Sequence, residues 1–360
     1  MATEYNIGLI GCGNMGKVWV GAVGGHPDCQ VTLVYDPDLK LAEERATKCG
    51  GKIAASAEQV VAAAEVDIVL ICTPTHTHPE IVALAAGAGK HILCEKPMAL
   101  TLDKCREILD VCGEAGVKLA IGQTLRFWGA FLEVRQQVAN GVIGTPCLAQ
   151  VLRGGATGVQ RVSPEGTGAD QVRRRWRFDT RYSGGDVLEG VVHELDFVRS
   201  MFGEVRAVYC TVTGKEDYEG LVSPRMIQAV LDFENGSQAT VRMGGTVGYA
   251  GGGSWVSGTE GTLVFDAWEG PVRHHISGNA EPGVLICPTT SAYELELRDL
   301  LAAIENDDEP ENSGINGMRN IGLGLAMYQS IARKKRLEFV DGIPVDVPGD
   351  YQYRGPSSVK

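Results

Sequence analysis

Two different spacings of apolar residues divide the first third of the chain into short elements. Brief β-branched and apolar runs alternate with Ala-rich stretches whose apolar residues recur at helical spacing. Strands separated by helices of this length indicate βαβ units and a parallel sheet. The predicted strands are Tyr5 to Ile10, Val31 to Tyr35, Ile68 to Cys72, His91 to Cys94 and Lys118 to Ile121, and the predicted helices are Met15 to Val23, Leu39 to Cys49, Ala57 to Ala64, Glu80 to Ala86 and Leu102 to Gly113.

The pattern changes after Ile121. A Gly- and Arg-rich passage runs up to Gly185, and the strands that follow it have no helices between them. Turn chemistry such as Glu234-Asn235-Gly236 joins two of these strands, which is typical of an antiparallel sheet. The predicted strands are Pro146 to Arg153, Val205 to Thr213, Met226 to Phe233, Ser237 to Met243 and Thr262 to Asp266, and the predicted helices are Phe131 to Asn140, Val187 to Met201, Ala292 to Asn306 and Gly317 to Lys334.

The predicted fold class is therefore α/β plus α+β. An N-terminal Rossmann domain with a doubly wound parallel sheet precedes a C-terminal domain with an open, mainly antiparallel β-sheet. The expected domains are 1–123, which binds the nucleotide, and 124–340, which binds substrate and forms oligomers. The Pro- and Gly-containing segment 341–360 is expected to be a C-terminal tail.

Composition narrows the function. The chain has 360 residues, is 44% apolar and carries a net charge of −12, so a nucleic-acid partner is not expected. No apolar segment is long enough to span a bilayer, and the amino terminus resembles no signal peptide, so we expect a cytoplasmic protein without a membrane partner. The ten cysteines form no CxxC pair, which argues against disulfides and a structural metal.

The stretch GLIGCGNMG contains a GxGxxG motif, formed by Gly11 to Gly16. It follows a predicted strand and opens a predicted helix, the context in which this motif binds a dinucleotide. The glycines allow a tight turn and a close approach of the backbone to pyrophosphate. A glycine turn without a ligand is the alternative. The motif residues expected to bind the cofactor are Gly11, Gly13, Asn14, Met15 and Gly16.

Asp36 ends the run VTLVYD at the distance from the motif where a ribose-binding carboxylate is expected. A carboxylate accepts hydrogen bonds from ribose hydroxyls and repels a 2′-phosphate. Pro37 and Asp38 follow it, without a basic residue. NAD is therefore favoured over NADP. Asp36 could instead cap the helix that begins at Leu39, or serve both purposes.

Two further loops follow predicted strands. Cys72 to Pro79 contains the pair His76 and His78, but no third ligand at a matching spacing favours a metal site. Glu95-Lys96-Pro97 ends an apolar run, where a buried unpaired Lys would be costly. It is either an exposed strand-to-helix loop or a lysine held at the edge of the sheet to contact a substrate.

The predicted helix that contains GGDVLEGVVHELDF supplies partners for such a lysine. Glu189 and His193 are four residues apart and share one face of a regular helix, with Asp196 beside that face. Alcohol oxidation requires removal of a proton from oxygen as hydride leaves carbon. His193 is the natural base, and Lys96 can stabilise the developing negative charge. An ordinary amphipathic helix is the alternative for Glu189 and His193 alone.

These residues, in this order, resemble the Gfo/Idh/MocA family, named for glucose–fructose oxidoreductase and inositol dehydrogenase. The similarity rests on GLIGCGNMG, CTPTHTHPE, GKHILCEKPMALT, EGVVHELD and the later GTEGTL, and it covers nearly the whole chain. It implies a substrate bound between the Rossmann edge and the open sheet. It also implies that Lys96 and His193 are catalytic, with Glu189 as an acidic partner and a Lys96-Pro97 bond that is often cis.

The resemblance further places five residues against the cofactor and Arg126 near the nicotinamide or substrate; the five are Thr73, Pro74, His78, Glu95 and Gln123. Two stretches depart from the family's pattern, one at residues 189–193 and one just before this helix. Glu189 replaces the usual Asp, and Val191 replaces a glycine two residues before the histidine. The glycine triplet before the helix is shortened to Gly184-Gly185-Asp186.

The basic segment Arg173 to Arg177 precedes this helix. A solvated or subunit-contact loop and a substrate-binding loop are equally good interpretations of it. In the second, Trp176 or Arg177 contacts the nicotinamide end or an anionic substrate group, and Asp179 and Tyr182 bind sugar hydroxyls.

The leading hypothesis is an NAD-dependent dehydrogenase for a secondary alcohol of a polyol or sugar. A recycling enzyme that retains NAD, such as a redox-assisted glycosidase or an aldose–aldose oxidoreductase, is the second. A sensor that binds NAD without catalysis is the third, and the presence of both Lys96 and His193 argues against it. An open sheet face indicates a homodimer or homotetramer formed through the C-terminal sheet, as in relatives.

Overall fold

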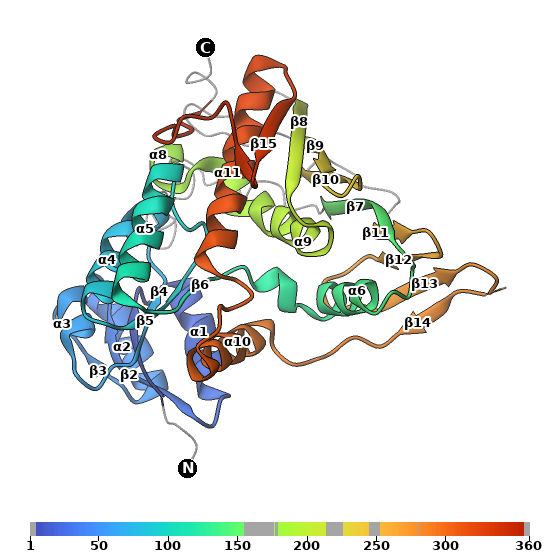
Figure 1. Cartoon of the computed structure of the whole chain (residues 1–360). Helices are drawn as coiled ribbons and strands as arrows, with labels where there is room; N and C mark the ends of the chain where they lie inside the picture. Colours follow the sequence, from blue (N-terminus) through green and yellow to red (C-terminus); the bar gives the residue numbers. More distant parts are fainter. Residues whose placement is uncertain are drawn as a thin grey trace, which may run out of the picture. The chain divides into compact units, whose positions relative to one another are not determined.

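The computed structural model of the chain describes residues 5–154, 176, 179–213, 226–244, 253–279 and 281–355 (Figure 1). These residues form two compact units. The first comprises Met1–Thr124 together with Thr290–Met318, and the second comprises Leu125–Thr289 together with Arg319–Lys360.

A six-stranded parallel sheet forms the centre of the first unit, with strand order β3-β2-β1-β4-β5-β6. This is the doubly wound order, in which successive strands extend the sheet first on one side of β1 and then, from β4 onward, on the other. The strands are β1 (Tyr5–Ile10), β2 (Cys29–Tyr35), β3 (Lys52–Ile53), β4 (Ile68–Ile71), β5 (His91–Cys94) and β6 (Leu119–Ile121), and the helices are α1 (Asn14–Gly24), α2 (Leu39–Cys49), α3 (Ala57–Ala62), η1 (Thr75–Thr77), α4 (His78–Gly87), α5 (Leu102–Ala115) and α10 (Ala292–Asn306).

Helix ends in the first unit follow local chemistry. Asp38 caps α2, and Thr101 caps α5 by accepting a hydrogen bond from the Lys104 amide. Both helices end at a glycine in the left-handed region, Gly50 and Gly116. Asp36 is not the α2 cap, which corrects that alternative.

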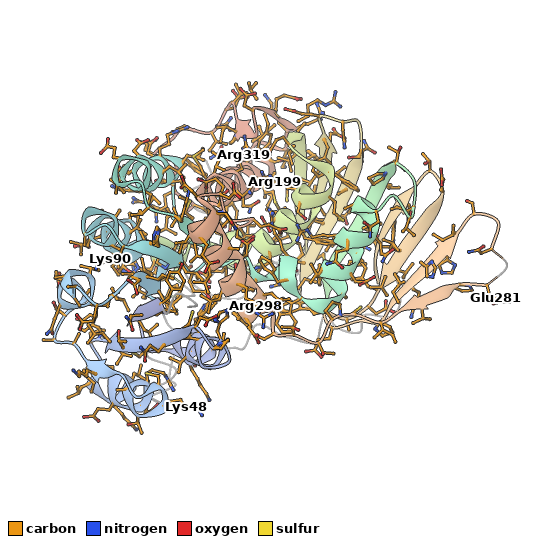
Figure 2. All side chains as sticks on the ribbon, turned by 60° about the horizontal axis from the view of Figure 1, so that its bottom comes forward. Lys48, Lys90, Arg199, Glu281, Arg298 and Arg319 are labelled. Atoms are coloured by element: carbon orange, nitrogen blue, oxygen red, sulfur yellow. The ribbon has the colours of Figure 1, made fainter. Side chains whose placement is uncertain are left out.

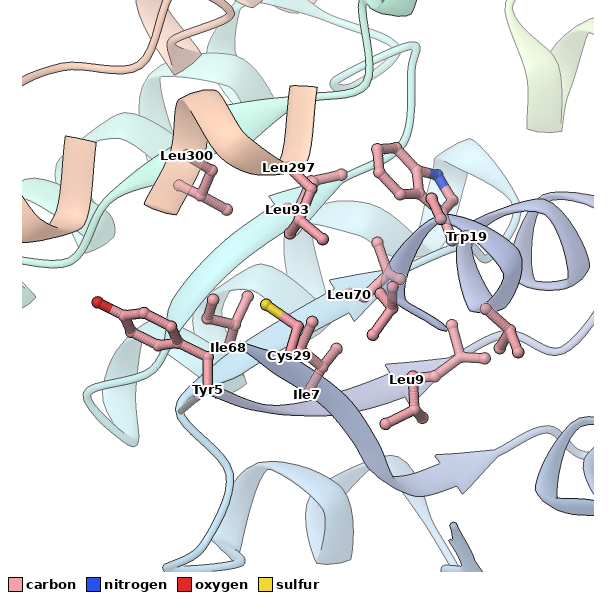
Figure 3. Close-up of a cluster of buried hydrophobic side chains, with 14 of the residues drawn as sticks. Tyr5, Ile7, Leu9, Trp19, Cys29, Ile68, Leu70, Leu93, Leu297 and Leu300 are labelled. Carbon is pink, nitrogen blue, oxygen red and sulfur yellow. The ribbon is translucent and has the colours of Figure 1, made fainter. Parts of the chain in front are cut away.

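The core of the first unit includes α10, although this helix lies far along the chain (Figure 3). Leu297, Leu300 and Leu301 are buried in the same cluster as Ile7 and Leu70. The predicted domains 1–123 and 124–340 place this helix in the other domain. In the structure it groups with the first unit because its apolar face covers that unit's sheet.

The second unit is built on a ten-stranded sheet of order β14-β13-β12-β11-β7-β10-β9-β8-β15-β16. Among the strand pairs described for this sheet, β7 and β10 alone are parallel, and the others are antiparallel. Its strands are β7 (Pro146–Gly154), β8 (Val205–Thr213), β9 (Met226–Phe233), β10 (Gln238–Gly244), β11 (Ser254–Gly258), β12 (Gly261–Phe265), β13 (Val272–Ile276), β14 (Gly283–Leu285), β15 (Leu337–Val340) and β16 (Ile343–Pro344).

Helices cover one face of this sheet, and aromatic rings fill the contact. Phe131 of α6 (Gly129–Ala139) and Phe197 of α9 (Val192–Phe202) meet edge to face with centroids 4.7 Å apart. Phe265 of β12 contacts both rings. The long helix α11 (Gly314–Arg333) begins in the first unit and ends in the second.

The other face of the sheet carries a row of residues that are opposite one another on successive strands. Tyr209 and Val230, at one end of this row, are 41% and 39% exposed. We call it the outer row; its members are Tyr209, Val230, Thr240, Gln150, Trp255 and Val264. The strand β9 alternates between buried and exposed residues as a sheet with one covered face requires.

The predicted fold class is confirmed, and several strand limits, such as those of β1, β5, β8 and β9, are as predicted. The sequence prediction missed β3, β11, β13, β14, β15 and β16, most of which are short. No helix among the described residues is long and apolar enough to cross a membrane. All ten cysteines are free thiols.

The membership of α10 in the first core has a testable consequence. Replacing Leu297 by Ala should lower the free energy of unfolding of the first unit by about 2–5 kcal/mol, because a buried leucine leaves a cavity. Hydrogen exchange at the β1 and β4 amides measures this. Leu39→Ala, at a 59% exposed position, is the control. Equal protection of β1 in both variants would contradict the assignment.

Candidate active site

Five strands that are neighbours in the sheet of the first unit, β2, β1, β4, β5 and β6, end at the same edge. A predicted site residue follows each of them. Gly11 follows β1 and Asp36 follows β2. Thr73 lies just beyond β4, Lys96 beyond β5 and Gln123 beyond β6. In doubly wound sheets this carboxyl edge, at the reversal of strand order, is where ligands bind.

The glycines of the Gly11–Gly16 loop are required by the backbone. Gly11 has φ +96°, and a Cβ there would lie 2.6 Å from the Cys72 carbonyl group. A Cβ on Gly16 would lie 2.2 Å from the Gly11 carbonyl oxygen. A Cβ on Gly13 would meet no atom within 4 Å, so space is open beside the amide groups that begin α1. This arrangement fits a pyrophosphate.

The Asp36 carboxylate is fixed against this loop. Its Oδ2 accepts a hydrogen bond of 2.8 Å from the Cys12 amide, and its Oδ1 accepts one of 2.8 Å from the Asp38 amide. Arg45 of α2 donates from Nε to the Cys12 carbonyl oxygen at 3.0 Å. Burial, followed by the charge of Asp36, raises the pKa of the Cys12 thiol to about 12. Cys12 is therefore an unreactive packing residue.

The ring of His78 joins two loops of this edge. Its Nδ1 lies 2.9 Å from the Pro97 carbonyl oxygen, and its Nε2 lies 2.9 Å from the Thr73 carbonyl oxygen. The Thr73 hydroxyl contacts that of Thr77 at 2.7 Å. The buried His78 side chain thus holds the loop after β4 beside the turn after β5. No group of metal-ligating residues occurs among the residues with described positions.

The Glu95-Lys96-Pro97 turn is anchored by its buried carboxylate. Trp19 of α1 donates from Nε1 to Glu95 Oε1 at 2.7 Å, and the Lys96 amide donates to Glu95 Oε2 at 3.1 Å. The Lys96-Pro97 bond is cis, as the family resemblance implies. The Lys96 side chain is half-buried. The same α1 helix therefore carries the glycine loop at its start and supports the lysine turn through Trp19.

Gln123 supplies evidence for a polar ligand at this edge. Its side chain is 1% exposed, yet neither amide atom has a hydrogen-bond partner in the part of the chain that the structure describes. Leaving such groups unpaired costs about 1–3 kcal/mol for each. A bound ligand with donors and acceptors would remove this cost, so the residues at this edge fit a dinucleotide.

The second unit carries Glu189 and His193, on a helix that is not uniform. Val187–Val191 forms a π-helical turn, and the regular helix α9 begins at Val192. The predicted continuous helix from Val187 to Met201 is corrected accordingly. Both Glu189 and His193 are half-buried. Single π-helical turns of this kind often occur at functional sites.

Gly190 explains how the π-helical turn packs. A Cβ at this position would lie 2.6 Å from the Met243 Cε atom of β10. The glycine next to Glu189 therefore permits the sheet to support the turn directly, although Val191 stands where the family has a glycine.

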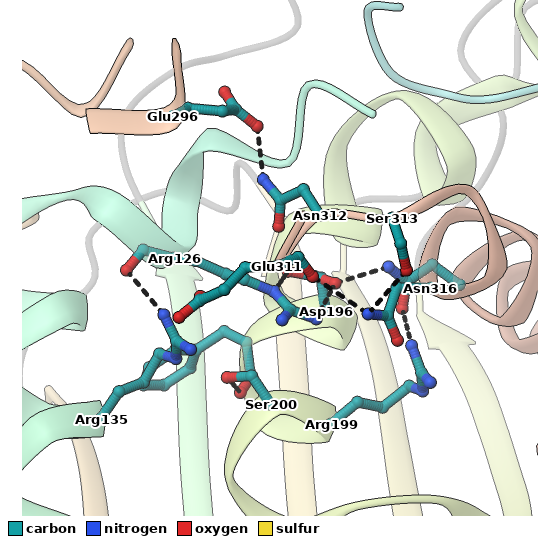
Figure 4. A network of polar contacts seen from close by, with 12 residues as sticks. Arg126, Arg135, Asp196, Arg199, Ser200, Glu296, Glu311, Asn312, Ser313 and Asn316 are labelled. Atoms are coloured by element: carbon teal, nitrogen blue, oxygen red, sulfur yellow. Dashed lines mark hydrogen bonds and ion pairs between the residues drawn. The ribbon is translucent and has the colours of Figure 1, made fainter. Parts of the chain in front are cut away.

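Arg126 is bound to a carboxylate of α9. Its guanidinium donates to both oxygens of Asp196, from Nε at 2.5 Å and from Nη2 at 2.7 Å (Figure 4). Both side chains are buried. Asn320 donates to Asp196 Oδ1 at 2.7 Å and accepts from Arg199 Nη1 at 2.8 Å. The predicted contact of Arg126 with nicotinamide or substrate stays a prediction, while the structure gives it a structural role.

The same network continues to a second carboxylate. Arg199 donates to both oxygens of Glu204, and Arg319 donates to Glu204 Oε1 at 3.0 Å. Arg199 and Arg319 are labelled close together in Figure 2. Burial lowers the pKa of Arg199 below its ordinary value. This chain of paired charges holds α9, and hence His193, in one position.

Arg153 was missed by the sequence reasoning. It donates from Nε to Glu194 Oε1 at 2.6 Å, and its guanidinium lies 4.8 Å from the ring centroid of Trp268. Glu194 is buried and directly follows His193. The sequence did contain a signal for such a partner. Glu194 lies on the apolar face of the predicted helix, and a buried carboxylate there requires a cationic partner.

The remaining predicted residues lie around α8 (Thr180–Ser183). Asp179 caps this helix and pairs with Arg181, which lowers the pKa of the Asp179 carboxyl. Trp176 is half-buried, and its carbonyl oxygen accepts from the Asp179 amide. Residues 155–175 and Arg177, including most of the basic segment, lie outside the described residues.

Family comparisons cover both units. Residues 5–123 match the model of an oxidoreductase family with an NAD-binding Rossmann fold, and residues 135–339 match the C-terminal alpha/beta domain of the same family. The chain belongs to the Gfo/Idh/MocA oxidoreductase family.

The similarity to relatives in the Gfo/Idh/MocA family extends over almost the whole chain. Inositol 2-dehydrogenase of Rhizobium meliloti is 29% identical over 92% of this chain and 98% of its own. The 1,5-anhydro-D-fructose reductase of Ensifer adhaerens is 31% identical over 93% and 99%. A levoglucosan dehydrogenase solved with NADH and levoglucosan has a TM-score of 0.83 at 21% identity, covering 93% of this chain and 99% of that one, which shows the shared fold.

Membership in the Gfo/Idh/MocA family confirms the predicted enzyme class and the NAD-binding Rossmann unit. The roles of single residues stay predictions. Within the first unit, the structure brings together the glycine loop, Asp36, the Thr73 loop and the Lys96 turn.

The position of Asp36 generates a prediction about cofactor choice. Replacing Asp36 by Ala should weaken NAD binding by roughly tenfold or more, because one or two hydrogen bonds of about 1 kcal/mol each are lost. Affinity for NADP should fall less, since the repelling carboxylate is gone. Calorimetric dissociation constants for both cofactors measure this. Asp36→Asn keeps an acceptor and is the control; an unchanged NAD-to-NADP ratio in Asp36→Ala would contradict the prediction.

Proposed function

We propose that this chain is an NAD-dependent dehydrogenase that oxidises a secondary alcohol of a polyol or sugar to a ketone, or catalyses the reverse reaction. One observation carries the proposal. Lys96 follows β5 at the carboxyl edge that bears the glycine loop and Asp36, on a turn fixed by Glu95 and Trp19. An ammonium group on a turn fixed at this ligand-binding edge is suited to contact a substrate hydroxyl.

The residues have separate roles in the proposal. Bound NAD supplies the hydride acceptor. Lys96 donates a hydrogen bond to the alcohol oxygen and stabilises negative charge as it develops there. His193 removes the hydroxyl proton, and Glu189 accepts a hydrogen bond from a neighbouring hydroxyl or from the histidine. Gln123 and the amides at the start of α1 hold the cofactor, while Asp36 accepts from its ribose.

The names of the relatives support the substrate class. One of them is named for inositol and one for an anhydrohexose, and both names denote compact rings with several hydroxyl groups. The proposed donor Lys96 and the proposed acceptors His193 and Glu189 suit such a ring, because each of its hydroxyl groups can both donate and accept a hydrogen bond. Asp179, Trp176 and Arg126 remain candidates for further substrate contacts.

A second candidate is a recycling enzyme that retains NAD through a redox-neutral cycle. A relative from Escherichia coli, 28% identical over 77% of this chain, is named 2,7-anhydro-N-acetylneuraminate hydratase, which is not a net oxidation. Such an enzyme would give no net NADH. Product analysis of the sugar, rather than cofactor absorbance, would identify it.

The substitution Lys96→Met tests the enzyme. Turnover should fall by about 10²–10⁴-fold, because an acid-base and charge-stabilising group is lost, while the NAD dissociation constant changes little. NADH formation with a panel of inositols, aldoses and sugar acids, repeated with NADP, provides the assay. Lys104→Met, on the exposed side of α5, is the matched control. Equal turnover in Lys96→Met and the wild type would disprove the role of Lys96.

We further propose that the chain forms a homo-oligomer through the outer row. Tyr209 and Val230 are exposed apolar residues on adjacent strands, and uncovered sheet faces of this kind are common interaction surfaces. The double substitution Tyr209→Lys with Val230→Lys should reduce the mass measured by light scattering to that of one chain. Val345→Lys, at another exposed position, is the control. A monomeric wild type would contradict the proposal.

A further inference from the structure

The turn before the π-helical segment requires two glycines. Gly184 and Gly185 have φ values of +77° and +81°, and they separate α8 from the turn that carries Glu189. A Cβ on Gly185 would lie 2.6 Å from the Tyr328 hydroxyl and 3.2 Å from the ring of Tyr353. Side chains from two distant segments of the second unit therefore close around this turn.

Tyr328, on α11, holds both ends of the turn through one hydroxyl group. The hydroxyl donates to the Gly184 carbonyl oxygen at 3.0 Å and accepts from the Val187 amide at 2.9 Å. Val187 is the first residue of the π-helical turn, whose opening amide has no partner within the helix. Burial raises the pKa of Tyr328 well above its ordinary value, so the hydroxyl keeps its proton and both contacts.

Tyr353, near the carboxyl end of the described chain, covers Tyr328. The two rings are stacked with centroids 3.5 Å apart and an angle of 4° between their planes. Tyr353 is only 4% exposed. The adjacent Gln352 donates from Nε2 to the Arg181 carbonyl oxygen of α8 at 2.8 Å. The segment expected to be a tail therefore contacts α8 through Gln352 and the ring of Tyr328 through Tyr353.

We propose that Tyr328 and Tyr353 are positioning residues for Glu189 and His193. The Tyr328 hydroxyl fixes where the π-helical turn begins, and stacking by Tyr353 fixes the Tyr328 ring. Glu189 is two residues beyond Val187, so a displaced opening amide would move its carboxylate. This inference rests on the proposed dehydrogenase function, because the readout of correct positioning is turnover.

Three substitutions separate positioning from simple packing. Tyr328→Phe removes only the hydroxyl, Tyr353→Ala removes the stacked ring, and Tyr353→Phe restores the ring without its hydroxyl. Turnover should fall about 10- to 100-fold in the first two variants, since small misplacements of catalytic groups have effects of this size. The KM for NAD should be unchanged, because the first unit is intact. Tyr353→Phe should return turnover close to wild type, and Tyr209→Phe on the outer row is the control.

Hydrogen exchange provides a readout that does not depend on the substrate. The amides of 187–191 should exchange faster in Tyr328→Phe and Tyr353→Ala, and at wild-type rates in Tyr353→Phe. If the wild type oxidises no polyol, the proposed function is disproved. If the two variants nevertheless exchange faster at these amides, the positioning role is still supported. Wild-type turnover in Tyr328→Phe and Tyr353→Ala, with only a lower melting temperature, would overturn the inference.

Discussion

The buried carboxylate of Glu95 fixes the arrangement of the nucleotide-binding unit. Burying a carboxylate is costly unless donors surround it, and here the donors are the indole of Trp19 and the amide of Lys96. Trp19 belongs to the helix that begins at the glycine loop. A single buried charge therefore links the loop that fits pyrophosphate to the turn that presents the lysine.

The second unit also buries charged side chains, and it stabilises them with a larger set of paired charges. Asp196 accepts from Arg126 and Asn320, and Arg199 bridges Asn320 to Glu204. Each buried group has an opposite charge or an amide beside it. Breaking one pair would leave another charge uncompensated, which is more costly than the pair itself is stabilising. Such networks specify one position for a helix, and α9 carries His193.

Much of the architecture could be predicted from the sequence because local patterns determine it. The glycine loop, the buried strands of the parallel sheet and the capped helices depend on neighbouring residues, and their limits were close to those observed. The short strands β3 and β14 carry few apolar residues and form by pairing with distant partners. The π-helical turn was missed because Tyr328, which supports its first amide, is remote in sequence. The pairing of Arg126 with Asp196 was not predicted for the same reason, because Asp196 lies seventy positions further along the chain.

The inclusion of α10 in the first core also has a consequence for biosynthesis. Because Leu297, Leu300 and Leu301 complete the cluster around β1 and β4, that core cannot be finished when residue 124 leaves the ribosome. The strands of the second unit are synthesised in between. An N-terminal domain usually folds before the next domain is synthesised. Here the first unit cannot complete its core in that order, because α10 is synthesised after the strands of the second unit. Until α10 is synthesised, the cluster around β1 and β4 lacks these three leucines and is held by the residues of the first unit that are already present, such as Trp19 and Val20 of α1.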